Sequence, residues 1–95
     1  MNKYEMLENK LAKISKHIDN MNLNNETSIK HLRKYKVYVN KLMSAVKDKT
    51  IKNSDGAALE LVQGISDYDE ICADNIFWDL VTDADNYYAH ECKLF

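Results

Sequence analysis

The sequence predicts an all-α fold, a single domain over residues 1–95 in which about four helices form an antiparallel bundle. Three observations favour this class. Apolar residues recur every three or four positions through most of the chain, no proline interrupts them, and 95 residues is the length of one domain. Residues 36–39 are the one short stretch with strand-like alternation, and their neighbours fit a helix better.

The first predicted helix covers residues 4–21. Its apolar residues form one stripe, Tyr4, Leu7, Leu11, Ile14, Ile18 and Met21. The same stripe is compatible with a coiled-coil strand, which leaves a homodimer through this helix open. The asparagine-rich residues 20–25 predict a turn after it, because asparagine side chains compete with helical hydrogen bonds.

A second helix is predicted from a cap at Asn25 or Thr27 to about Asp48, with a strongly basic polar face. Residues 48–56 then predict a loop, since they end in a run of turn-forming residues, Asn53 to Gly56.

A third helix is expected to begin at a cap, Ser54 or Asp55, and to run to Cys72. A restart at Ser66 is an alternative, and Gly64 marks either a close helix approach or a bend. Asp74 is the expected cap of a fourth helix that ends near residue 91.

Charge is divided unevenly along the chain. Residues 1–53 carry twelve Lys or Arg and five acids, whereas residues 54–95 carry ten acids and one lysine. Clustered charge of one sign steers association, so this division points to a charged partner. The alternative is that the two halves neutralise each other across the fold, and the sequence does not decide which half binds.

We find no signature of catalysis, of a cofactor or of a metal site. The two glycines are isolated at 56 and 64, so no glycine-rich phosphate loop exists, and the histidines pair with no nucleophile. Cys72, His90 and Cys92 lack the spacing of metal ligands. We therefore expect no enzyme activity, no cofactor, no metal and two reduced cysteines. Because neither a membrane-length apolar run nor a signal peptide is recognisable, we expect a cytoplasmic protein without membrane contact.

The last third of the chain combines aromatic and acidic residues. Six of the nine Phe, Tyr and Trp residues lie beyond position 66, among eight acids. Neighbours on a helix diverge by about 100°, so Phe77-Trp78 and Tyr87-Tyr88 cannot all face one core. Exposed rings supply anchor area and carboxylates pair with basic groups, although outer aromatics can also merely flank a small core. The predicted partner-binding residues are Tyr68, Asp69, Glu70, Trp78, Asp79, Asp83, Asp85, Tyr87 and Tyr88.

The segment Ile65–Glu91, ISDYDEICADNIFWDLVTDADNYYAHE, resembles bacterial immunity proteins that neutralise nuclease toxins of the colicin and contact-dependent inhibition types. The resemblance rests on size, charge pattern and surface chemistry and includes no shared motif. It implies a tight stoichiometric inhibitor whose acids meet the basic nucleic-acid cleft of a toxin.

We therefore expect a non-catalytic binding protein that neutralises a basic partner, with a nuclease toxin as the partner class. Two alternatives stay open, a self-associating helical module and nucleic-acid binding through the basic second helix. Nucleic acid is the less favoured partner, because the pI is near 5.9 and Arg33 is the only arginine of that helix.

Overall fold

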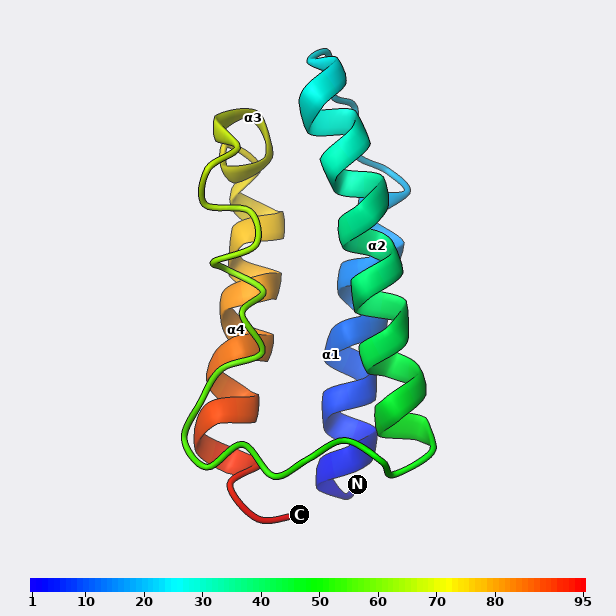
Figure 1. Cartoon of the computed structure of the whole chain (residues 1–95), viewed down its shortest axis with the longest axis vertical. Helices are drawn as coiled ribbons and strands as arrows, with labels where there is room; N and C mark the ends of the chain where they lie inside the picture. The colour runs from blue at the N-terminus through cyan, green and yellow to red at the C-terminus, as the bar shows by residue number, and fades with distance from the viewer.

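A computed structural model describes all residues, 1–95, and confirms the all-α class. Its helices are α1 (Lys3–Ile18), α2 (Glu26–Lys47), α3 (Asp69–Cys72) and α4 (Asn75–Glu91), and it contains no strand. In Figure 1, α1 runs upward, α2 and α4 run downward, and residues 48–68 climb from the end of α2 to α3. None of the helices combines the length and the apolar character needed to cross a membrane.

Two of the three long helices begin at predicted caps. The Asn25 side chain accepts hydrogen bonds from the amides of Thr27 and Ser28, and Asp74 accepts one from the Phe77 amide at 2.9 Å. These bonds satisfy amides that the first turn of a helix leaves without partners. The caps therefore fix where α2 and α4 start.

The predicted third helix is wrong for most of its length. Residues 55–68 form a succession of turns, and only Asp69–Cys72 is helical. The backbone is left-handed at Asp55, Gly56 and Glu60, a conformation that cannot belong to a right-handed helix. We call residues 48–68 the strap.

The middle of the strap is bound from both sides by polar side chains. From α4, the buried Asp85 carboxylate accepts hydrogen bonds from the amides of Leu61 at 3.1 Å and Val62 at 2.8 Å. From α2, the Tyr35 hydroxyl donates to the Leu61 carbonyl at 2.8 Å. Burial, with the nearby Asp85 charge, raises the pKa of this hydroxyl, so it stays protonated and donates. These bonds replace those that a helix would supply to the same backbone groups.

Further contacts hold the strap along its length. The Tyr88 hydroxyl of α4 donates to the Lys52 carbonyl at 2.7 Å, and the His31 imidazole of α2 donates to the Gly64 carbonyl. A Cβ added at Gly64 would lie 3.1 Å from the Tyr35 ring. Glycine at this position therefore lets the strap approach α2 closely.

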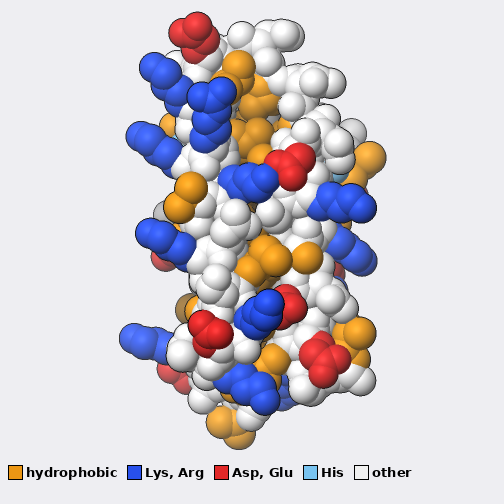
Figure 2. All heavy atoms as spheres, turned by 90° about the vertical axis from the view of Figure 1, so that its right-hand side faces the viewer, with side chains coloured by type: hydrophobic (Ala, Val, Ile, Leu, Met, Phe, Trp, Pro, Cys, Tyr) orange, Lys and Arg blue, Asp and Glu red, His pale blue; other side chains and the backbone are white.

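The strap and α1 together separate α2 from α4. α1 packs against both of these helices, whereas the backbones of α2 and α4 do not touch each other (Figure 1). The outward faces of α2 and α4 consequently lie on opposite sides of a molecule that measures 40 × 21 × 18 Å. Figure 2 looks onto the side that α2 occupies in Figure 1 and shows Lys and Arg side chains along it.

The apolar stripe of α1 lies inside this bundle. Leu7, Leu11 and Ile14 are completely buried, and Ile18 is 8% exposed. The helix ends at Ile18, three residues before the predicted end at Met21. A homodimer that paired two chains through this stripe would have to open the core of each. The buried stripe is therefore not available for the self-association that the sequence left open.

We predict that Asp85→Ala strongly destabilises the fold, because the two amides that bind Asp85 lose their hydrogen-bond acceptor. The buried N–H of Leu61 and the half-buried N–H of Val62 lose their acceptor, which should lower the free energy of unfolding by about 3 kcal/mol. Asp83→Ala, which removes an exposed carboxylate two residues earlier on α4, is the matched control and should cost less than about 1 kcal/mol. Urea denaturation of both variants measures the difference, and equal losses would contradict the role of Asp85.

Candidate functional site

The structure does not bring the nine predicted partner-binding residues together on one surface. Asp85 and Tyr88 are 6% and 7% exposed, and their polar atoms bind the strap. This corrects the prediction for both residues. Their positions on the inner side of α4, in line with Val81 and Ala84, place them in the core, and the strap supplies backbone partners that the sequence pattern does not reveal.

Two further residues, Asp83 and Tyr87, are engaged by a lysine of α1. The Asp83 carboxylate pairs with Lys10 Nζ at 2.6 Å, and the same ammonium lies 5.1 Å from the centre of the Tyr87 ring. A neighbouring cation neutralises the acid and occupies the face of the ring. Asp83 and Tyr87 therefore already interact with Lys10 within the chain.

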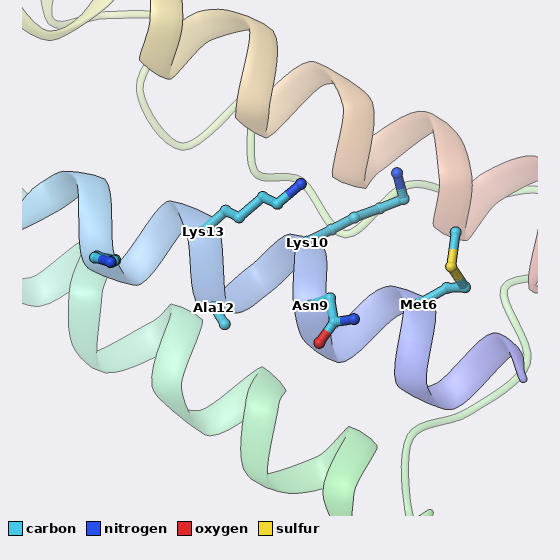
Figure 3. A pocket seen from close by; sticks show the side chains of 6 residues that line it. Met6, Asn9, Lys10, Ala12 and Lys13 are labelled. Atoms are coloured by element: carbon cyan, nitrogen blue, oxygen red, sulfur yellow. The ribbon is translucent and has the colours of Figure 1, made fainter. Parts of the chain in front are cut away.

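Lys10 also lines a shallow groove of about 400 Å³ on α1. Figure 3 shows Lys10 and Lys13 extending from α1 toward α4, with Met6 beside them. Asn9, Ala12 and Lys16 complete the lining, which includes no carboxylate, no imidazole and no thiol. The ionisable side chains of the groove are therefore lysines alone, Lys10, Lys13 and Lys16.

Tyr68 and Glu70 join the α3 end of the molecule to α2. The Tyr68 ring stacks on the His31 imidazole with ring centres 3.8 Å apart. The Glu70 carboxylate accepts hydrogen bonds from the amides of Asn24 at 2.6 Å and Asn25 at 3.2 Å. Negative charge is favoured at this place because it lies at the amino end of α2. Both side chains are half-buried, and their main contacts lie within the chain.

Asp69, Trp78 and Asp79 remain on the surface. The two aspartates are exposed and form no ion pair, and Trp78 is 36% exposed. All three lie where α3 meets the first turns of α4, at the upper end of the molecule in Figure 1. With Asp83, whose side chain is 58% exposed beside Lys10, they are the members of the predicted set that are exposed on the surface.

Two neighbours, Asp67 and Ile76, were not among the predicted site residues. Asp67 is exposed, and Ile76 is 64% exposed although its side chain is aliphatic. A helical projection provides the missing signal, because Ile76 lies about 100° from its buried neighbour Phe77. We call Asp67, Asp69, Ile76, Trp78 and Asp79 the acidic corner.

Asp74 lies beside the acidic corner and is already bound. Its carboxylate accepts a hydrogen bond from the Phe77 amide and contacts His17 Nε2 at 2.8 Å. Burial opposes ionisation of Asp74, but the hydrogen bonds from Phe77 and His17 outweigh it and lower the pKa below the ordinary value of 3.8. Asp74 therefore joins α4 to α1 and is not a free charge for a partner.

No group of three His, Cys, Asp or Glu side chains is arranged to hold a metal ion. Cys72 and Cys92 are free thiols, half-buried and buried respectively. Burial raises the pKa of both, so each stays protonated near neutral pH.

Comparison with known proteins adds no family to this description. No protein-family model, curated protein or solved structure matches the chain.

We predict that acid removes a stabilising contribution of Asp74. Because its pKa is lowered in the folded state, the contribution is complete above the unfolded value of 3.8 and is lost as pH falls through the folded pKa. Asp74→Asn keeps the capping oxygen but cannot ionise. The difference in free energy of unfolding between the natural chain and this variant should be constant near pH 5 and shrink toward about pH 2.5. A difference that stays constant over this range in chemical denaturation would contradict the assignment.

Proposed function

We propose that this protein is a non-catalytic binding protein that captures a basic partner through the acidic corner. One observation carries the proposal. The exposed carboxylates of Asp69 and Asp79 form no ion pair within the chain, and they accompany two exposed apolar side chains, Ile76 and Trp78. Exposed apolar side chains beside unpaired carboxylates suit a partner whose surface has a pocket for the apolar side chains and lysine or arginine around that pocket.

A nuclease is the class of partner that we propose. Enzymes that bind nucleic acid present clustered lysine and arginine to phosphates, and carboxylates of a second protein can occupy the same groups. The resemblance of Ile65–Glu91 to bacterial immunity proteins supports the same class. The proposed action is stoichiometric blocking of the basic cleft, with no chemical step, inside the cytoplasm where both proteins are made.

The proposed roles differ among the residues of the acidic corner. Trp78 and Ile76 act as anchors, because burying exposed apolar surface is what slows dissociation. Asp67, Asp69 and Asp79 steer the partner and pair with its cations, which mainly raises the association rate. Asp83 contributes after a partner displaces Lys10 from it.

The test uses the product of the adjacent reading frame as partner, measured by calorimetry and by its nuclease activity. We expect one-to-one binding and loss of nuclease activity. The triple variant Asp67→Asn, Asp69→Asn, Asp79→Asn should lower the association rate at low salt about tenfold, and Trp78→Ala should raise the dissociation rate at least about tenfold.

The control removes three charges at the opposite end of the molecule. Glu5→Gln, Asp48→Asn and Glu91→Gln alter exposed acids at the start of α1, the end of α2 and the end of α4. This variant should bind within about twofold of the natural chain. Equal effects of the two triple variants, or a complex that leaves nuclease activity intact, would overturn the proposal.

A further inference from the structure

We propose that the outward face of α2 is a separate binding surface that holds double-stranded nucleic acid by its phosphate backbone. Residues 27–47 contain six Lys or Arg and no acid. Lys30, Arg33, Lys34 and Lys41 are exposed, and none of them forms an ion pair. We call these four residues the basic face.

The contacts of α2 show that the basic face points away from the rest of the chain. On one flank, His31 and Tyr38 contact the strap, and on the other flank Lys36 and Asn40 contact α1. Positions on a helix advance by about 100° per residue, so Lys30, Lys34 and Lys41 share the side between these flanks. Figure 2 shows the resulting column of Lys and Arg side chains.

The nearest acids of α2 and the strap lie at the ends or the edge of the basic face, and none lies between its four cations. Glu26 and Asp48 lie at the two ends of α2, and Glu60 of the strap lines a shallow hollow together with Lys34. From Lys30 to Lys41 the helix rises about 16 Å, which is the rise of about five base pairs of duplex DNA. A line of four cations of this length matches a run of phosphates.

The acidic pI does not argue against this surface. The outward face of α4 lies on the other side of the molecule from the basic face, and the molecule measures 21 and 18 Å along its two short axes. At physiological salt the Debye length is about 8 Å, so the acids of α4 are largely screened from a ligand that lies on α2. The local charge of the basic face decides binding, rather than the formal net charge of −2.

The shape and chemistry of the basic face favour nucleic acid over other anions. A membrane surface needs an apolar face to insert, but most apolar residues of α2 are buried or partly buried. Of its two exposed large apolar residues, Val37 and Tyr38, Val37 lies along the basic face and Tyr38 contacts the strap. A second copy of this chain would offer the acidic corner, which is confined to one end of the molecule. Three of the four cations are lysines, which act as point charges, so we infer backbone contacts without base readout.

The test measures binding of a fluorescent duplex of about 20 base pairs by anisotropy between about 50 and 200 mM salt. Four phosphate contacts should give a slope of log affinity against log salt of about −3.5, equal for unrelated sequences. Lys30→Gln, Lys34→Gln and Lys41→Gln together should weaken binding at low salt at least about tenfold and reduce the slope to about −1. Circular dichroism confirms that the variant keeps its helices.

The matched control, Lys13→Gln with Lys52→Gln and Lys93→Gln, removes three exposed lysines from outside α2. It should bind the duplex within about threefold of the natural chain, as should the triple variant of the acidic corner. No binding at low salt, or equal loss in the control, would overturn the proposal. Binding to phosphatidylserine vesicles in place of the duplex would also overturn it. Because the proposed nuclease interaction uses other residues, either proposal can fail without the other.

Discussion

The rest of the structure depends on the two hydrogen bonds that the Leu61 backbone forms. Its N–H donates to Asp85 of α4 and its C=O accepts from Tyr35 of α2, so one residue of the strap links two helices whose backbones do not touch. A buried irregular segment needs such partners, because an unpaired amide or carbonyl in the interior costs as much as a lost hydrogen bond. The strap thereby completes the bundle in the position where a third long helix was expected.

This arrangement separates the charges of the chain instead of mixing them. The Lys10–Asp83 ion pair and the contact between His17 and Asp74 join the basic and acidic halves. Both connect α1 with α4 or with its N-cap residue. Lys36 of α2 pairs with Asp19 of the same basic half, and the other cations of α2 form no ion pair, since α1 and the strap keep the α4 backbone away from them. The protein therefore presents surfaces of opposite sign on opposite sides, and each suits a different class of partner.

Periodicity and capping rules predicted the three long helices because their signals are local. Asn25 and Asp74 cap helices in the structure as they do in the sequence pattern. The loop predicted over residues 48–56 is confirmed, but residues 57–68 of the strap were predicted as a helix because their apolar residues also fit a helical spacing. Their actual hydrogen bonds come from residues distant in the chain. The same limit applies to the site. A sequence shows that Asp79 and Asp85 are acids, but only the packing decides that one is exposed and the other buried.

Amide hydrogen exchange at Leu61 and Val62, followed by NMR, tests most directly whether the strap is a fixed structural element. Both amides should exchange as slowly as those in the middle of α2 and α4, because they are bound to a buried carboxylate and open only with the fold as a whole. Exchange as fast as in an exposed loop would mean that the strap opens by itself. In that case Asp85 would not hold α2 and α4 in place, and the separation of the two charged surfaces would lose its structural basis.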